Sequence, residues 1–169
     1  HTLVFFIFLN QLTRTTPIVM LIMQKLKDYQ QLMKLNLSML VVFSSVVAYI
    51  IIPGQSIAWS KLLLLFLGGT LVTAAANAGN EILERRTDKL MRRTMTRPLP
   101  DARMGITEAI LFCTCTLLLG LFILNTYFNT LSAVLSLVSF VLYVFVYTPL
   151  KKITPISVLV AALPGSLPC

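Results

Sequence analysis

The chain has 169 residues, of which 57% are hydrophobic and 12% are charged, and its mean hydropathy is +0.85. Soluble domains carry about 25% charged residues, so this composition excludes an ordinary soluble globular protein. It also excludes a disordered chain, because so much apolar surface would not stay solvated. The sequence predicts an all-α, multi-span membrane protein that folds as a helix bundle. The net charge of +8 indicates a negatively charged surface or ligand.

Residues 1–27 are expected to form an N-terminal segment that lies before the main domain, which we place at 28–169. The apolar block at the start is too short to span a bilayer, and we assign it no function. The chain begins with His1, and Met20 or Met23 is a candidate native start.

Intervals without charged residues mark the expected spans, because a helix needs roughly 20 apolar residues to cross a bilayer. The polar stretch 125–130 divides an uncharged run, 109–150, that is too long for one helix and suits a hairpin of two. We expect four complete spans and a truncated fifth, at 35–53, 62–80, 106–124, 131–148 and 155–169.

Positive charge is distributed unequally between the two sides of the predicted bundle. With the N-terminal side in the cytoplasm, the loops on that side hold every Lys and Arg except Lys61. This asymmetry follows the positive-inside rule. We therefore predict a cytoplasmic N-terminus and a multi-pass protein of a bacterial inner membrane. A mitochondrial inner-membrane protein, which would face its matrix in the same way, is the alternative.

The segment 80–100, NEILERRTDKLMRRTMTRPLP, concentrates charge where the second predicted span ends. Asn80, Glu84 and Asp88 recur every four residues and stack on one helical face, with Glu81 beside Asn80. Stacked carboxylates near hydrocarbon are unfavourable unless something compensates them. Their oxygens suit Mg²⁺, which commonly shares a bound phosphate with one or two carboxylates. We predict that these four residues bind Mg²⁺, and that Asn80, Glu84 and Asp88 form the catalytic group.

Basic residues near this array are predicted to bind an anion. Three arginines follow it, and a guanidinium group matches phosphate oxygens in bidentate fashion. Two further loops on the same side add two lysines and a tyrosine. The predicted diphosphate-binding residues are Lys34, Arg92, Arg93, Arg97, Tyr147 and Lys151. The structural alternative is an ordinary positive loop, in which Glu81 and Glu84 form solvated pairs with helical neighbours such as Arg85 and Asp88.

The same segment resembles the first acidic motif of the UbiA-type intramembrane prenyltransferases. NEILERRTD (80–88) is similar to Asn-Asp-x-x-Asp-x-x-x-Asp, with Glu81 and Glu84 in place of aspartates. MRRTMTRPLP (91–100) and the segment that begins YTPLKK (147–168) resemble runs typical of the branch that farnesylates protohaem IX.

DYQQLMKLNLSMLVVFSSVVAY (28–49) resembles the first helix of that branch, so the likeness covers 28–169. It departs from the family at 34–36, where Lys-Leu-Asn replaces the usual Lys-Pro-Arg and weakens one basic contact. Family members continue with further spans and a second acidic motif. The resemblance therefore implies that these residues form the N-terminal half of the domain, and that they are inactive alone.

The resemblance implies a Mg²⁺-dependent prenyltransferase that moves a farnesyl group from farnesyl diphosphate to the vinyl group of haem B. The product is haem O, used by haem A/O-dependent terminal oxidases. The implied partners are both substrates, the lipid bilayer and oxidase assembly proteins, but no nucleic acid. Basic residues would neutralise the departing diphosphate, and apolar helices would shield the allylic cation from water.

Three other functions remain open on the residues alone. A related enzyme would prenylate a quinone precursor or another lipophilic aromatic. A cation transporter fragment would use Asn80, Glu84 and Asp88 to line an ion path, although the adjacent arginines would repel the cation. A structural subunit of a respiratory assembly gives no reason for the periodic acids.

Overall fold

The computed structural model describes residues 2–51 and 58–151, and all the regular structure within them is helical. The elements are α1 (Thr2–Met33), α2 (Leu35–Ile51), α3 (Trp59–Asp88), α4 (Ile106–Tyr127), α5 (Thr130–Val141), the π-helix η1 (Leu142–Tyr147) and α6 (Thr148–Leu150). The predicted all-α fold is confirmed.

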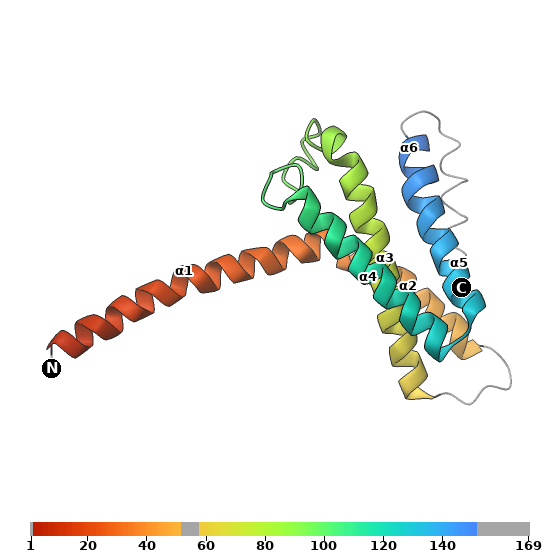
Figure 1. Cartoon of the computed structure of the whole chain (residues 1–169), viewed down its shortest axis with the longest axis horizontal. Coiled ribbons are helices and arrows are strands. Elements are labelled where there is room, and N and C mark those ends of the chain that lie inside the picture. Colours follow the sequence, from red (N-terminus) through yellow and green to blue (C-terminus); the bar gives the residue numbers. More distant parts are fainter. Residues whose placement is uncertain (1, 52–57, 152–169) are drawn as a thin grey trace.

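Helix α3 lies at the centre of the bundle and contacts every other described helix. Its middle, residues 67–79 (LGGTLVTAAANAG), consists mainly of small residues, and such residues let helix backbones approach closely in a membrane. Figure 1 shows α2, α4 and α5 gathered around α3, whereas most of α1 extends away to one side. The helix that carries the acidic array is thus the one enclosed by the others.

Among the residues that the structure describes, three helical stretches are long and apolar enough to cross a membrane: Trp59–Asp88, Ile106–Tyr127 and Thr130–Leu150. We call the last of these, made of α5, η1 and α6, the fourth span, because it corresponds to the fourth span expected from the sequence, at 131–148. The pair Ile18–Met33 and Leu35–Ile51, bent by 49°, supplies one more if it is counted as a single span.

Three expected spans thus match helices, but α3 continues beyond the predicted end of its span at residue 80 and reaches Asp88. The expected first span coincides with α2, which follows α1 after a bend. The expected boundary between the N-terminal segment 1–27 and the main domain 28–169 falls inside the unbroken helix α1. This division of the chain stays a prediction. The expected fifth span, 155–169, lies outside the described residues. The expected orientation in the membrane, with the N-terminus in the cytoplasm, also stays a prediction.

The bend between α1 and α2 is centred on Lys34, whose φ of 48° lies in the left-handed region that non-glycine residues seldom adopt. Two side chains satisfy the carbonyl that the bend exposes. Ser38 Oγ donates to the Met33 carbonyl at 2.9 Å, and Asn77 Nδ2 donates to the same oxygen at 3.0 Å. Asn77 belongs to α3, so these bonds hold the bend against the central helix.

Helices α3 and α4 lie close together at Gly120, and this contact predicts a loss of stability on substitution. A Cβ there would lie 2.8 Å from Val72 Cγ2 and 3.1 Å from the Gly68 carbonyl oxygen, which is backbone and cannot turn away. We expect Gly120→Ala to lower the free energy of unfolding by about 2 kcal/mol.

The matched control for this change is Gly105→Ala, because a Cβ at Gly105 meets nothing closer than Glu108 Cβ at 4.0 Å. It should leave the stability within about 0.5 kcal/mol of the unmodified protein. Thermal unfolding in detergent measures both variants. Equal effects at the two glycines would mean that the α3–α4 crossing does not depend on close backbone contact.

Candidate active site

The four predicted metal ligands lie on one buried face of α3. Asn80, Glu81, Glu84 and Asp88 are 2%, 0%, 6% and 3% exposed, so they lie inside the bundle and not in a solvated loop. Arg85, which was expected to form a solvated pair with Glu81, donates instead to a backbone carbonyl of its own helix at 2.8 Å. The alternative of an ordinary solvated charged loop is therefore wrong for this face.

Glu84 is paired with Lys151 from the far end of the fourth span. Lys151 Nζ lies 2.7 Å from Glu84 Oε1 and 2.8 Å from Oε2. The same ammonium group lies 5.4 Å from the centre of the Tyr147 ring. The structure therefore brings Tyr147 and Lys151 together as predicted, and it joins them to an acid 67 residues earlier in the chain.

Asp88 is paired with Arg97 from the loop between α3 and α4. Arg97 Nη1 lies 2.6 Å from Asp88 Oδ2, and Thr94 Oγ1 donates to the Asp88 carbonyl at 2.9 Å. The loop thus folds back over the end of its own helix. Arg92 and Arg93 are exposed, and among the described residues neither forms an ion pair with an acid. Of the three predicted arginines, only Arg97 reaches the array.

Glu81 is the one acid of the array that has no partner among the described residues. Its side chain is fully buried, and neither carboxylate oxygen accepts a hydrogen bond there. The backbone of Leu99 faces it without reaching hydrogen-bond geometry. Arg97 and Lys34 attract its charge, whereas Asp88 repels it. An unpaired buried carboxylate is unfavourable, so this position calls for a bound cation or a proton.

Lys34 reaches this group from the bend between α1 and α2. Its ammonium interacts electrostatically with Glu81 and Glu84, and with the cations Arg97 and Lys151. The side chain is half-buried. The predicted convergence of basic residues is therefore present for Arg97 and Lys151, which pair with the buried acids, and Lys34 lies near enough to interact with these acids electrostatically.

Asn80 contacts Thr148, a residue that sequence reasoning did not select. Thr148 Oγ1 lies 2.9 Å from both Asn80 Oδ1 and the carbonyl oxygen of Tyr143, and its side chain is 1% exposed. A hydroxyl has one proton, so it donates to one of these oxygens at a time. The π-helix η1 lies directly before this point, and Pro149, which has no backbone N–H to donate, follows.

Asn77 was also missed, although the sequence carries a signal for it. It lies three residues before Asn80 and four before Glu81, so it continues the same helical stripe toward the membrane interior. Its side chain is 5% exposed, and its amide donates to Met33 and to Ser38 Oγ, the latter at 3.1 Å. No sequence pattern indicates Thr148 in the same way, because its contact with Asn80 of α3 joins residues 68 positions apart.

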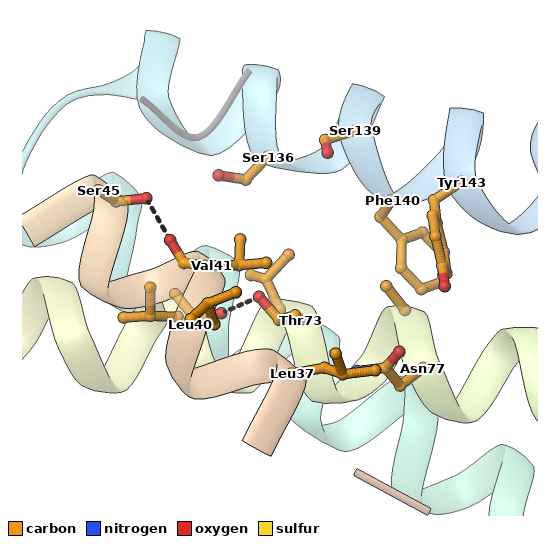
Figure 2. Close-up of a pocket in the computed structure, with 14 residues that line it drawn as sticks. Leu37, Leu40, Val41, Ser45, Thr73, Asn77, Ser136, Ser139, Phe140 and Tyr143 are labelled. Atoms are coloured by element: carbon orange, nitrogen blue, oxygen red, sulfur yellow. Dashed lines mark hydrogen bonds between the residues drawn. The ribbon is translucent and has the colours of Figure 1, made fainter. Parts of the chain in front are cut away.

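An apolar cavity of about 290 Å³ lies between α2, α3 and the fourth span. Leu37, Leu40, Val72 and Phe140 are among the residues that line it. Figure 2 shows Phe140 and Tyr143 reaching from the fourth span toward α3, with Asn77 at the same end of the cavity. Because Asn77 is one turn from Asn80 and Tyr143 one turn from Tyr147, this end of the cavity adjoins the charged site.

The donor set of the site fits a hard divalent cation only in part. Among the described residues, no three Asp, Glu, His or Cys side chains are placed to hold a metal ion together. The array nevertheless offers oxygen ligands on this face, and one of them, Glu81, is buried with no hydrogen-bond partner in the described part of the chain. Such a set fits an ion that takes its other ligands from a bound phosphate and water, as Mg²⁺ commonly does.

The fold and the site define a multi-pass helical membrane protein whose buried charges gather at one end of an apolar cavity. The UbiA prenyltransferase family matches residues 41–169, and the chain belongs to this family. The resemblance that the acidic motif indicated is thereby confirmed.

Most of the chain is similar in sequence to curated proteins of other organisms. The protoheme IX farnesyltransferase of Cytophaga hutchinsonii is 41% identical over 140 residues, which cover 83% of this chain and 49% of the relative. That of Christiangramia forsetii is 42% identical, covering 85% and 47%. The mitochondrial protoheme IX farnesyltransferase of Arabidopsis thaliana is 40% identical, covering 83% and 33%.

The chain spans about half the length of the bacterial relatives named above. No solved structure matches it significantly.

Proposed function

We propose that the full-length protein transfers a farnesyl group from farnesyl diphosphate to the vinyl group of haem B, giving haem O. The observation that carries the proposal is the buried carboxylate of Glu81, which has no hydrogen-bond partner among the described residues and is attracted by the cations Arg97 and Lys34. It lies where the charged site adjoins an apolar cavity. Such a site suits a ligand with an anionic head and an apolar chain. The names of the relatives support the choice of farnesyl and haem.

We propose that Asn80, Glu81, Glu84 and Asp88 hold Mg²⁺. When bound, this ion would supply positive charge to the oxygens of the diphosphate. The ion pairs of Glu84 with Lys151 and of Asp88 with Arg97 place acids and cations alternately at one site. A ligand that contains both a cation and an anion therefore finds a complementary partner for each.

The basic residues provide the electrostatic assistance that the reaction requires. In the proposed mechanism the allylic C–O bond ionises, and the departing diphosphate takes the electron pair of that bond. Lys34, Arg97 and Lys151 stabilise its developing negative charge, while Tyr147 holds Lys151 in place. We assign Arg92 and Arg93 a weaker role at longer range, because they are exposed.

The apolar cavity would hold the farnesyl chain and exclude water from the allylic cation. The vinyl group of haem then supplies the electron pair for the new C–C bond, and water adds to the resulting cation with loss of a proton. No protein nucleophile is needed. The family resemblance implies a second acidic motif in a part of the relatives that this chain does not cover, so we expect the 169 residues alone to be inactive.

The site disfavours a path for free cations, because Arg97 and Lys151 lie against the acids and would repel a cation that arrives without a bound anion. Prenylation of a quinone precursor uses the same diphosphate chemistry and differs only in the acceptor.

We place the protein in a bacterial inner membrane, with its N-terminus in the cytoplasm. Its proposed partners are the bilayer, both substrates and terminal oxidase assembly proteins.

A prenyl-transfer assay distinguishes the two acceptors. The full-length protein in membranes, given farnesyl diphosphate and Mg²⁺, should convert haem B to haem O and leave 4-hydroxybenzoate unchanged. Chelation of divalent ions with EDTA should stop the reaction, and added Mg²⁺ should restore it. Prenylation of 4-hydroxybenzoate alone would contradict the haem assignment, and full activity in EDTA would contradict the metal assignment.

A further inference from the structure

A second group of charged residues lies where α1 meets the loop between α3 and α4. Arg103 Nη1, near the end of this loop, lies 3.1 Å from Asp28 Oδ1 on α1, and the Asp28 side chain is 3% exposed. The contact is an ion pair without hydrogen-bond geometry, since Asp28 Oδ1 accepts no hydrogen bond from the described residues. Nearby, Lys25 and Tyr29 of α1 both contact Glu108 of α4, at 3.0 and 2.7 Å. None of these five residues belongs to the acidic array.

Arg103 is bonded to the residues on both sides of Arg97. Its Nη2 donates to the Thr96 carbonyl at 2.6 Å, and its backbone N–H donates to the Pro98 carbonyl at 3.0 Å. The turn that brings Arg103 back to this position includes Ala102, which has a φ of 58°. One guanidinium thus joins a buried acid on α1 to the backbone that carries Arg97.

Arg97 in turn is the loop residue that pairs with Asp88. A continuous set of contacts therefore runs from Asp28 through Arg103 to Arg97 and the acidic array. Apolar packing supports the loop independently, because Leu99 and Met104 belong to a buried cluster that also contains Leu32 of α1. That packing can hold the loop against α1 without fixing the position of a single guanidinium.

We propose that Asp28 is a positioning residue for the diphosphate site: by binding Arg103, it fixes the loop backbone around Arg97 and so places Arg97 against the acidic array. The proposal rests on the proposed function, because it assigns Arg97 to a prenyl diphosphate. Asp28 does not line the cavity, and its ion pair among the described residues is with Arg103 and not with a residue of the array. Its effect is therefore expected to appear in the binding of one substrate only.

The principal test is Asp28→Asn in the full-length protein. The variant keeps the shape of the side chain but removes the charge that holds Arg103. We expect the KM for farnesyl diphosphate to rise about tenfold, in the range seen when a residue that orients a ligand-binding group is removed. The KM for haem B should stay unchanged. The matched control is Asp101→Asn, since Asp101 also pairs with Arg103, at 3.0 Å, but its side chain is 53% exposed.

Hydrogen exchange of the loop peptides provides a readout that does not depend on activity. Asp28→Asn should weaken the protection of the amides in 96–104, whereas Asp101→Asn should not. If Asp28→Asn folds poorly because Arg103 then keeps only the exposed Asp101 as an acidic partner, the double variant Asp28→Asn/Arg103→Gln removes the charge of Arg103. It should fold and show the same selective rise in KM.

The possible results distinguish the positioning role of Asp28 from the proposed function of the whole protein. Unchanged protection of 96–104 in Asp28→Asn would overturn the positioning role, whatever reaction the protein catalyses. Lost protection together with an equal rise of both KM values would also overturn it, because the effect would then be a general loss of structure. Lost protection in a protein that does not prenylate haem would leave the loop contact supported and contradict the proposed function instead.

Discussion

Replacing Glu81 by Gln is expected to stabilise the ligand-free protein and to abolish prenyl transfer. Glu81 is fully buried, and neither carboxylate oxygen has a hydrogen-bond partner among the described residues. An uncharged amide of nearly equal size costs less to bury than a carboxylate. We expect the free energy of unfolding to rise by about 1 kcal/mol and turnover to fall by about 10³-fold, because the substitution removes a proposed Mg²⁺ ligand.

Glu84→Gln is the matched control, because the same chemical change occurs one turn later on the same helix. Glu84 is paired with Lys151, so its replacement leaves a cation without a partner and should lower the stability. Both variants should lose activity. Thermal unfolding in detergent, with and without Mg²⁺ and inorganic diphosphate, measures these effects. A fall in stability for Glu81→Gln as large as that for Glu84→Gln would mean that Glu81 has a structural partner and no ligand role.

Much of the fold and part of this site follow from the sequence, because both depend on local periodicity. Uncharged intervals located α3, α4 and the fourth span, since the length of an apolar helix is set by the bilayer. The four-residue spacing of Asn80, Glu84 and Asp88 placed them on one face, since any helix turns by about 100° per residue. Their burial follows from the small residues of α3, which bring the neighbouring helices close.

The parts that could not be predicted depend on contacts between distant residues. Nothing in MRRTMTRPLP distinguishes Arg97 from Arg92. The distinction arises because Thr94 binds the Asp88 carbonyl, which turns the loop back over the helix end. Similarly, the contact of Thr148 with Asn80 joins residues 68 positions apart. The local spacing therefore identifies the acids, but it does not distinguish Arg97, which pairs with one of them, from the exposed Arg92 and Arg93.

Because Arg97 pairs with Asp88 whereas Arg92 and Arg93 are exposed, we expect alanine substitutions at the three arginines to have unequal effects. Arg97→Ala should raise the KM for farnesyl diphosphate about 100-fold, equivalent to about 2.7 kcal/mol. It should also lower the stability by about 3 kcal/mol, because Asp88, with a side chain only 4% exposed, would keep an uncompensated charge. Arg92→Ala and Arg93→Ala, each at an exposed position, should change this KM less than about threefold, since exposed charges interact weakly.

Steady-state kinetics with each substrate varied in turn would measure these effects, at a temperature where the Arg97→Ala variant remains folded. Arg97→Lys provides the conservative comparison. It keeps the charge that balances Asp88, so the stability should recover, but a single ammonium group cannot contact two oxygens in the planar manner of a guanidinium. The KM for farnesyl diphosphate should therefore recover only in part. Equal effects of all three alanine substitutions would show that the diphosphate responds to the general positive field of the loop, and the specific assignment of Arg97 would then be wrong.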